Sequence, residues 1–531
     1  MSLDKDKKLA EVLRAGFVAL NGGDAKRAAE CCRAAMGIDR DNPEVHFLVG
    51  LVALDMDDMR TAASAFGSVT KLSPSHAAAW AQLARIFMRM GQPARAEQAL
   101  VKATMAGTDD PAVEDLIGVV ASLLGNQREA KKWYQRAATK APDRAAYGVN
   151  LASAQTFLGE TDDAEKTLNN LLSRHGDIAQ AHWLLSSLRK AETTDRADIL
   201  MDKANRAKDA HSKAFLGYAA GKEYEDCEAW SEAFSAFSLG AKAKHSTLTF
   251  DEKKEDAMFA ALMNIFSKDW AEKRRAGHDD PAPIFVVGQP RTGTTLIERI
   301  ITSHSMVESA GELQQFGLSV HRLSKGSFKD RWTPEAIEAS ATIDPAALGR
   351  EYLRASMPMR KNAAHFVDKL PGNYLHVPLI LAALPNARIV HLTRDPMDSC
   401  FASFKQLFAE AYHHSYDQAE MARHHLRYAR LMAHWREVFP GQFLDVSYEK
   451  TVSDLEPNAR RLIDFLGLRW EDQCLEFHTQ RSAVATASAV QVREKLHQRS
   501  VGRWRCYDNK LAPMETILRE AGNFQSFDSN M

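Results

Sequence analysis

The sequence has little cysteine for its size. Its 531 residues include only 6 cysteines, and no two of them have the C-x-x-C spacing of a redox or zinc motif. So sparse a set excludes a disulfide framework and favours a reducing compartment. No apolar run approaches the roughly 18 residues of a membrane span, and the opening stretch MSLDKDKKLAEVL has no apolar core of signal-peptide length. We therefore expect a cytoplasmic protein with no membrane span.

An excess of charge of either sign is also missing. Lysine and arginine together number 68, aspartate and glutamate 69, and the formal net charge is −1. A chain with this balance has no overall electrostatic attraction to nucleic acid or to an acidic membrane. We therefore expect no nucleic-acid partner, and any anion-binding site must be local.

A third absence is that of one particular lysine. Residues 284–297 read IFVVGQPRTGTTLI, in which Gly288 and Gly293 have the G-x-x-x-x-G spacing of a nucleotide phosphate-binding loop. Thr294 stands where such a loop has the lysine that contacts the β- and γ-phosphates. The loop separates a buried-strand pattern from an amphipathic helix, so backbone N–H groups and a helix N-terminus converge there. The sequence therefore predicts an anion site that works without this lysine.

Two further features indicate that the loop handles its anion without a metal ion. The cation inside the loop is Arg291, whose planar guanidinium suits a tetrahedral oxyanion. A later strand pattern, RIVHLTRD, ends in Thr393 and Arg394, where a nucleoside-triphosphate hydrolase would have a metal-binding aspartate. We therefore expect no metal in the site.

The N-terminal half of the sequence repeats itself. Alanine recurs every 34 residues from Ala28 to Ala164, and a large or apolar residue follows each of these alanines by four positions. This pattern resembles the tetratricopeptide repeat, whose units are pairs of antiparallel helices. We expect about seven helical hairpins over residues 1–247 and a connecting helix over 248–280, a generic helical bundle being the alternative. The concave face of such a solenoid commonly receives a peptide or protein segment, which we expect as the partner.

From residue 281 onward the pattern changes. Short runs rich in β-branched and aromatic residues (PIFVVG, RIVHLT, FLDVSY) alternate with helical stretches, which is typical of a parallel sheet with crossover helices. The predicted fold class is thus α plus α/β in two domains. An N-terminal tetratricopeptide-repeat α-solenoid is followed by a P-loop-like α/β domain over residues 281–531.

Five segments of this second domain together resemble the sulfotransferase family, whose donor is 3′-phosphoadenosine-5′-phosphosulfate (PAPS). They are IFVVGQPRTGTTLIERIITSH, ESAGEL, VDKLPGNYL, ARIVHLTRDPMDSC and HQRSVGRWRCY. The likeness covers residues 281–510 and is strongest to bacterial tetratricopeptide-repeat sulfotransferases and, more distantly, to tyrosylprotein sulfotransferases. It implies a P-loop-like sulfotransferase domain that moves a sulfuryl group from PAPS to an acceptor hydroxyl without a metal.

The resemblance implies a set of donor-binding residues. The residues that match the loop around the 5′-phosphosulfate are Arg291, Thr292, Gly293, Thr294 and Thr295. Arg394 matches the arginine that binds the 3′-phosphate, a role that suits a guanidinium at a strand end. The family usually has a serine eight residues after this arginine. This chain has Ala402 there, so Ser403, Ser399 or neither supplies the hydroxyl.

Weaker matches complete the donor site. Tyr448 resembles a tyrosine beside the adenine, although a tyrosine after a strand is often simply packed. The residues that resemble the C-terminal loop over the nucleotide are Arg499, Gly502, Arg503 and Trp504, with Arg499 a candidate second ligand of the 3′-phosphate. Ser488 matches, loosely, a serine near the transferred group.

The resemblance also implies catalytic residues. Glu312, in ESAGEL, falls on the glutamate that serves as the base in tyrosylprotein enzymes. Lys369 matches a lysine of the same enzymes and would stabilise charge on the leaving phosphate, together with Arg291. The alternatives are that Glu312 is an ordinary loop carboxylate and that Lys369 is a surface lysine paired with Asp368.

Several questions stay open at this stage. A peptide or protein tyrosine is the favoured acceptor, with a carbohydrate or small-molecule hydroxyl as the alternative. A nucleotide kinase and a non-catalytic repeat adaptor are the rival functions. The histidine pairs at 413–414 and 424–425 suggest a metal site, but adjacent histidines on a helix diverge and no carboxylate lies at ligand spacing. We therefore predict that they lie on a solvated helix face.

Overall fold

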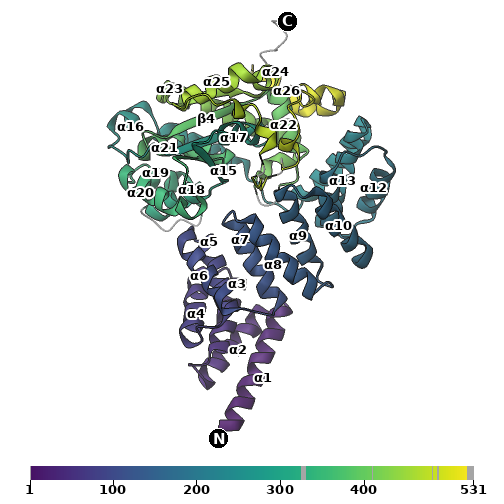
Figure 1. Cartoon of the computed structure of the whole chain (residues 1–531), viewed down its shortest axis with the longest axis vertical. Helices are drawn as coiled ribbons and strands as arrows, with labels where there is room; N and C mark the ends of the chain where they lie inside the picture. Colours follow the sequence, from purple (N-terminus) through teal and green to yellow (C-terminus); the bar gives the residue numbers. More distant parts are fainter. Residues whose placement is uncertain (1, 325–329, 409–410, 481, 487–488, 523–531) are drawn as a thin grey trace. The chain divides into compact units, whose positions relative to one another are not determined.

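The computed structural model describes residues 2–324, 330–408, 411–480, 482–486 and 489–522 (Figure 1). The chain divides into two compact units, Met1–Tyr147 and Gly148–Met531. Each unit has its own hydrophobic clusters and is described separately below. The division falls inside a helix, α9 (Ala145–Leu158), which belongs to the repeat region.

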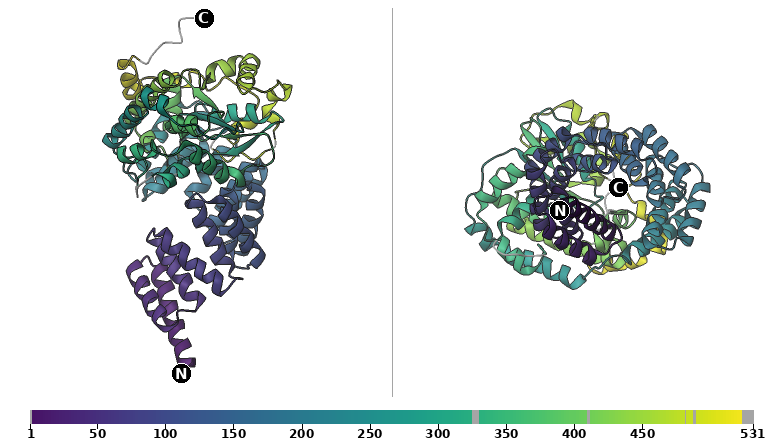
Figure 2. Two further views of the ribbon diagram at one scale, coloured as in Figure 1. Left: turned by 90° about the vertical axis from the view of Figure 1, so that its left-hand side faces the viewer. Right: turned by 90° about the horizontal axis from the view of Figure 1, so that it is seen from below.

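The first unit consists of helical hairpins (Figure 2). The alanines that repeat every 34 residues are fully buried, as at Ala62 and Ala130. Glycine allows the closest approaches, because a Cβ on Gly50 would lie 2.7 Å from the Phe66 ring and one on Gly118 would lie 2.7 Å from the Tyr134 ring. The helices are α1 (Ser2–Asn21), α2 (Ala25–Ile38), α3 (Pro43–Asp55), α4 (Met59–Leu72), α5 (Ala77–Arg89), α6 (Pro93–Ala106), α7 (Pro111–Leu123) and α8 (Gln127–Lys140).

The repeats continue into the second unit. The helices here, after α9, are α10 (Thr161–His175), α11 (Ala179–Leu188), α12 (Asp195–Arg206), α13 (Ala210–Asp226) and α14 (Trp230–His245). In the last hairpin a Cβ on Gly221 would lie 2.5 Å from the Phe237 ring, which repeats the close approach of Gly50 to Phe66. Within the described part of residues 2–247 there are fourteen helices, as seven two-helix repeats require. The predicted repeat architecture is confirmed.

The rest of the second unit is an α/β fold. Helices α15 (Glu252–Ile265) and α16 (Lys268–Lys273) fall in the predicted connecting segment. The described strands form one parallel sheet in the order β2-β3-β1-β4-β5. They are β1 (Pro283–Gly288), β2 (Val307–Gly311), β3 (His365–Asp368), β4 (Arg388–Thr393) and β5 (Leu444–Ser447). The predicted fold class, with its parallel sheet, is confirmed.

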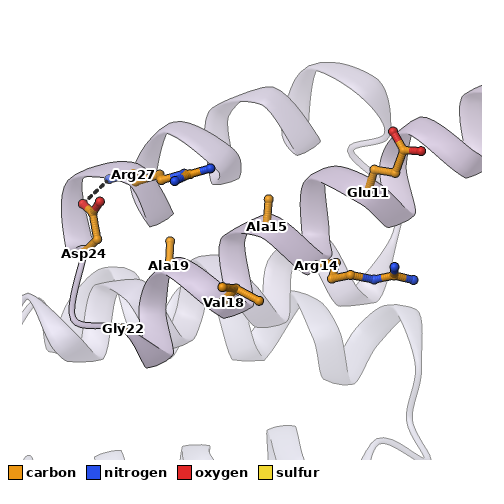
Figure 3. Close-up of a pocket in the computed structure, with 8 residues that line it drawn as sticks. All are labelled: Glu11, Arg14, Ala15, Val18, Ala19, Gly22, Asp24 and Arg27. Carbon is orange, nitrogen blue, oxygen red and sulfur yellow. Dashed lines mark hydrogen bonds between the residues drawn. The ribbon is translucent and has the colours of Figure 1, made fainter.

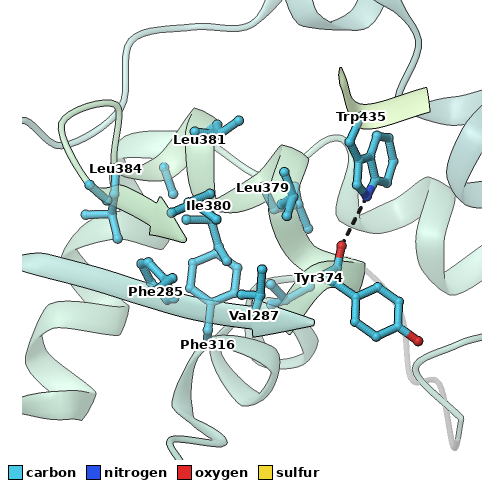
Figure 4. Close-up of a cluster of buried hydrophobic side chains, with 14 of the residues drawn as sticks. Phe285, Val287, Phe316, Tyr374, Leu379, Ile380, Leu381, Leu384 and Trp435 are labelled. Carbon is cyan, nitrogen blue, oxygen red and sulfur yellow. Dashed lines mark hydrogen bonds between the residues drawn. The ribbon is translucent and has the colours of Figure 1, made fainter. Parts of the chain in front are cut away.

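Both faces of the sheet are covered by apolar clusters. Successive side chains of a strand point to opposite faces, so Phe285 and Val287 of β1 enter one cluster while Ile284 and Val286 enter the other. Figure 4 shows the first cluster, in which the Trp435 indole N–H donates to the Tyr374 carbonyl at 3.1 Å. Because β1 is central and buried along its whole length, the loop that follows it starts from a fixed point.

The helices of this fold connect the strands and cover the sheet (Figure 1). They are α17 (Thr294–Thr302), α18 (Gln315–Leu323), α19 (Pro334–Ser340), α20 (Pro345–Ser356), α21 (Val377–Ala383), α22 (Pro396–Phe404), α23 (Gln418–Val438), α24 (Tyr448–Ser453), α25 (Leu455–Phe465) and α26 (Ala512–Glu520). A 3-10 helix, Arg503–Leu511, precedes α26. None of the helices in the described ranges is both long and apolar enough to cross a membrane.

The last repeat packs directly on this fold. One apolar cluster joins Tyr218 and Phe237 of the α13–α14 hairpin to Phe401 of α22, Tyr507 of the 3-10 helix and Leu518 of α26. The Tyr218 hydroxyl donates to the Phe404 carbonyl at 2.9 Å. The hairpin and the C-terminal half of the α/β fold therefore share a core.

Candidate active site

The loop between β1 and α17 has the backbone geometry of an anion cradle. Gly288 has φ +148° and Gly293 has φ +98°, values that L side chains rarely adopt. Arg291 has φ +65°, which is uncommon for a residue with a side chain and marks a constrained loop. A Cβ on Gly293 would lie 2.6 Å from the Tyr448 ring. The loop therefore turns tightly under that ring and presents the first N–H groups of α17.

Arg394, after β4, ties this loop to the C-terminal segment. Its Nη1 donates to the Arg291 carbonyl at 2.7 Å and its Nη2 donates to the Ser500 carbonyl at 2.5 Å. The guanidinium carbon lies 4.8 Å from the centre of the Tyr448 ring. The Nε–H is buried and has no hydrogen-bond partner among the described residues. A buried donor of this kind usually has a partner, so a ligand acceptor would fit beside it.

Arg291 and Arg394 form a pair of close cations. Burial and, to a smaller extent, the neighbouring charge of Arg394 lower the pKa of Arg291 to about 10. One side-chain nitrogen of Arg291, Nη2, donates to Gln491 Oε1 at 3.3 Å. Two partly desolvated guanidiniums repel each other, so an anion that binds between them stabilises both charged groups.

Two serines of α22 donate hydrogen bonds to the loop between β1 and α17. Ser403 Oγ donates to the Pro290 carbonyl at 3.2 Å, and Ser399 Oγ donates to Gln289 Oε1 at 3.0 Å. Both hydroxyls are buried. In this structure they hold the loop, so the role of Ser403 as a donor ligand stays a prediction.

The C-terminal loop is pinned by one buried carboxylate. Asp398 accepts hydrogen bonds from the Gly502 N–H at 2.6 Å and the Trp504 N–H at 3.2 Å. Burial raises the pKa of Asp398, and the nearby Arg394, at 4.0 Å, opposes that shift. The Arg499 side chain is more than half exposed and pairs with Glu494. The loop residues predicted from the sequence thus lie together, with Arg499 at the rim.

The predicted catalytic residues meet at the ends of two neighbouring strands. Glu312 follows β2 and Lys369 follows β3, and the Lys369 ammonium forms an ion pair with Glu312 Oε1. The Lys369 N–H also donates to the Gly311 carbonyl at 2.9 Å. The Lys369 side chain is 1% exposed, whereas that of Glu312 is 41% exposed. The pair therefore has a buried cation and an accessible carboxylate.

The alternative reading of Lys369 is wrong. Lys369 is buried and pairs with Glu312, so it is not a surface lysine bound to Asp368. Asp368 instead accepts from the Tyr352 hydroxyl at 2.9 Å and from the Leu313 N–H at 3.3 Å. Burial raises the pKa of Asp368 to about 8.

Two residues near this pair were not singled out from the sequence. Glu298 of α17 is buried, accepts from the Ser309 hydroxyl at 2.5 Å, and has a pKa that burial and Glu312 raise while Lys369 lowers it. The pKa of Tyr412 is raised mainly by burial and also by Glu312. Glu298 sits in the amphipathic pattern TTLIERI, where a glutamate is normally read as solvent-facing, and nothing local to Tyr412 connects it to Glu312.

Comparison with known proteins identifies the fold. Residues 283–472 match the model of the sulfotransferase family, and residues 53–119 match that of the tetratricopeptide repeat. Residues 283–472 form a sulfotransferase-family domain. The loop, Arg394 and the Glu312–Lys369 pair all lie in this sulfotransferase domain.

Three similar proteins illustrate the range of the likeness. An uncharacterized protein of Aquifex aeolicus is 29% identical over 403 residues, which cover 74% of this chain and 52% of that protein, so the match spans about half of its length. A putative protein-tyrosine sulfotransferase of Caenorhabditis briggsae is 24% identical over 42% of this chain and 80% of its own. A solved sulfotransferase domain from the curacin biosynthetic pathway is 15% identical, covers 47% of this chain and 99% of its own, and has a TM-score of 0.32.

The histidine pairs of the sulfotransferase domain are not solvated, so that prediction was wrong. His414, His424 and His425 are buried, and the rings of His414 and His424 stack at 3.4 Å. Glu255 of α15, far away in the sequence, accepts from His424 Nδ1 at 2.8 Å, and the three ligand atoms of Glu255, His414 and His424 lie within 4.8 Å of one another. Arg427 donates to the other carboxylate oxygen of Glu255 at 2.9 Å. Burial lowers the pKa of His414 to about 4, so this histidine is neutral near pH 7.

The repeat region has a shallow pocket of its own. Figure 3 shows it between α1 and α2, where the Asp24 carboxylate accepts from the Arg27 N–H at 3.0 Å. Val18 in its wall is 66% exposed. The lining residues are Glu11, Arg14, Ala15, Val18, Ala19, Gly22, Asp24 and Arg27.

The remaining predicted site residue, Ser488, lies outside the described residues.

Proposed function

We propose that this protein is a PAPS-dependent sulfotransferase that transfers a sulfuryl group to an acceptor hydroxyl. The observation that carries the proposal is the combination of a lysine-free anion loop, held by Arg394, with the Glu312–Lys369 pair at the ends of the adjoining strands. Ligands of open α/β sheets bind outside the carboxyl ends of the strands, and both features lie there.

The donor would bind along the loop. Arg291 and the N–H groups of residues 292–295 face the 5′-phosphosulfate, and Arg394 takes the 3′-phosphate, for which its buried Nε–H offers a donor. Tyr448, whose ring covers Gly293, would face the adenine. Guanidinium groups balance the charge of the donor, and no step of this proposal requires a metal.

Transfer would follow a direct in-line displacement. Glu312 accepts the proton of the acceptor hydroxyl as its oxygen forms a bond to sulfur. The bond between sulfur and the bridging oxygen breaks, and adenosine 3′,5′-bisphosphate leaves with the bonding electrons. Lys369 and Arg291 stabilise the charge that develops on the bridging and sulfuryl oxygens. The ion pair with Lys369 fixes the orientation of the Glu312 carboxylate before the acceptor arrives.

A peptide or protein tyrosine is the acceptor that we propose. Glu312 is accessible enough to meet a side chain presented from solvent, and the relative from Caenorhabditis briggsae is named a putative protein-tyrosine sulfotransferase. The helical repeats offer a docking surface for the rest of such a substrate. All six cysteines are free thiols, which supports the proposed cytoplasmic location.

Calorimetry tests the donor. Adenosine 3′,5′-bisphosphate and ATP with Mg²⁺ would be titrated separately into the wild type and Arg394→Ala. We expect binding of the bisphosphate that the substitution weakens about 100-fold, since a buried charge-assisted contact is lost. Binding of ATP with Mg²⁺ in preference to the bisphosphate would support a nucleotide kinase, and binding of neither would support a repeat adaptor.

A further inference from the structure

A buried acidic residue of the last repeat lies among the cations of the donor site. Glu225, near the end of α13, accepts from the Tyr507 hydroxyl at 2.9 Å and from the Lys405 ammonium at 2.5 Å. Arg503 Nε lies 3.4 Å from the same carboxylate oxygen. Only 14% of the Glu225 side chain is exposed. The charge of Glu225 also reaches the loop itself, because it raises the pKa of Arg291.

The hairpin that carries Glu225 is fixed against the donor site. The hydrogen bond from Tyr218 ends on the Phe404 carbonyl, one residue before Lys405. The Arg503 guanidinium lies 4.4 Å from the centre of the Trp230 ring, and that ring lies 5.6 Å from the ring of Tyr507. Lys405 and Arg503 are therefore positioned by side chains of the repeat as well as by their own backbone.

The Lys405 ammonium is largely removed from solvent and has two like charges near it. Burial lowers the pKa of Lys405, the guanidiniums of Arg503 and Arg394 lower it further, and Glu225 raises it. Tyr507 faces the same carboxylate, and the Phe401 ring lies 5.2 Å from the ammonium. Among these charged groups, Glu225 is the one that favours the charged form of Lys405. Without it, a buried amine beside two guanidiniums would tend to lose its proton.

We propose that Glu225 is a positioning residue of the donor site, which keeps Lys405 and Arg503 beside Arg394 so that they bind the 3′-phosphate of the donor. The inference rests on the proposed function, because it presumes a bisphosphate nucleotide at Arg394. It makes the last helical repeat a component of donor recognition. Loss of the Glu225 carboxylate would weaken donor binding, because the carboxylate acts through two cations that belong to the α/β fold and not to the repeat.

A comparison of two carboxylates on α13 tests the proposal in the full chain. Glu223→Gln is the matched control, because Glu223 is also buried but pairs with Arg196 inside the repeats. Adenosine 3′,5′-bisphosphate and adenosine 5′-monophosphate, which lacks the 3′-phosphate, would each be titrated at pH 6 and pH 8. Thermal denaturation of each variant would report any general loss of stability.

We expect Glu225→Gln to weaken bisphosphate binding about tenfold at pH 8 and by less at pH 6, because a lower pH favours the charged form of Lys405. Binding of the monophosphate should change by less than about twofold, as should bisphosphate binding by Glu223→Gln, which is remote from the donor cations. Glu225→Asp keeps the charge and should restore the affinity of the wild type at both pH values. A purely structural role would move neither the pH dependence nor the preference for the 3′-phosphate.

Bisphosphate binding by Glu225→Gln equal to that of the wild type at both pH values would overturn the proposal and leave the donor site intact. If the wild type itself failed to bind the bisphosphate, the proposed function would be wrong. If Glu225→Gln did not fold, Lys405→Gln would replace it. That variant should lose about tenfold in bisphosphate affinity at both pH values, and an unchanged affinity would equally overturn the proposal.

Discussion

The two halves of the site are built in different ways. The proposed donor half, around Arg291 and Arg394, consists of cations tied to backbone carbonyls and to the C-terminal loop. The proposed catalytic half is a single ion pair, Glu312 with Lys369, at the ends of two strands. The first arrangement preforms a cradle for a large anion, whereas the second leaves one carboxylate open to solvent. The difference predicts that the halves can be damaged separately, one in affinity and the other in rate.

The largest separation should come from Glu312→Gln. Loss of the general base should lower kcat by about 1000-fold, because such proton transfer contributes roughly 100- to 10,000-fold. The dissociation constant of adenosine 3′,5′-bisphosphate should stay the same. Steady-state rates with a tyrosine peptide and PAPS, beside calorimetry, would measure both quantities.

Glu308→Gln is the control for this variant, since Glu308 lies on β2, the strand that Glu312 follows, but accepts from the Lys361 N–H. It should keep kcat within about twofold of the wild type. Equal loss of rate in both variants would show that Glu312 acts only through the local structure of β2.

Lys369→Met should have a smaller effect of the same kind. Methionine has a side chain of similar length but no ammonium, so the leaving oxygen loses its stabilising charge. We therefore expect kcat to fall about 100-fold. The bisphosphate should bind with about the same affinity, because Lys369 pairs with Glu312 and not with the donor cradle. A fall in donor affinity as large as the fall in kcat would place Lys369 in the donor half and weaken the comparison.

Gly293→Ala probes the donor half instead. A Cβ at φ +98° is strained and would lie 2.6 Å from the Tyr448 ring, so the loop must shift and donor affinity should fall about tenfold. At saturating PAPS, the kcat of this variant should equal that of the wild type.

Gly467→Ala matches the strain of Gly293→Ala without the collision, since Gly467 has φ +74° and open space around it. It should lower thermal stability but leave donor affinity unchanged. If Gly467→Ala lowered donor affinity as strongly as Gly293→Ala does, the collision of the loop with Tyr448 would not be the cause of the lower affinity.

The last expected effect is on stability and not on activity, and it concerns Asp368, behind the catalytic half. Its pKa is raised from the usual range near 4 to about 8 in the folded protein, so the folded state binds the extra proton between these values. The contribution of Asp368 to the stability of the folded state is therefore complete below about pH 4 and is lost as the pH rises through 8.

Asp368→Asn should therefore flatten the fall in unfolding free energy between pH 5 and pH 8, by about 1.4 kcal/mol per pH unit over most of this range. Chemical denaturation at several pH values would measure it. Parallel curves for the variant and the wild type would show that Asp368 does not retain its proton in the folded protein.

Much of the fold could be predicted from the sequence because its signals are local. The 34-residue period placed alanines such as Ala62 and Ala130 at the contacts between paired helices, and both are buried. The spacing of Gly288 and Gly293 placed the loop between a strand and a helix, where it lies.

The failures share one cause, which is that a partner came from a distant part of the chain. His424 was predicted to lie on a solvated helix face because adjacent histidines on a helix diverge, yet it is buried and Glu255, on α15, accepts its hydrogen bond. Lys369 was weighed as a partner of the adjacent Asp368, yet its partner is Glu312 on the neighbouring strand. Such pairs depend on which elements pack together, and local spacing carries no record of that.

The sequence by itself determined the helical repeats, the parallel α/β fold and the position of a lysine-free anion loop, because periodicity and turn chemistry act over a few residues. Only the tertiary structure decided that Glu312 meets Lys369, and that Glu225 of the last repeat reaches Lys405 and Arg503. The physical reason is burial. A charge removed from water must find its counter-charge wherever packing provides one, and packing brings together residues that the chain keeps far apart.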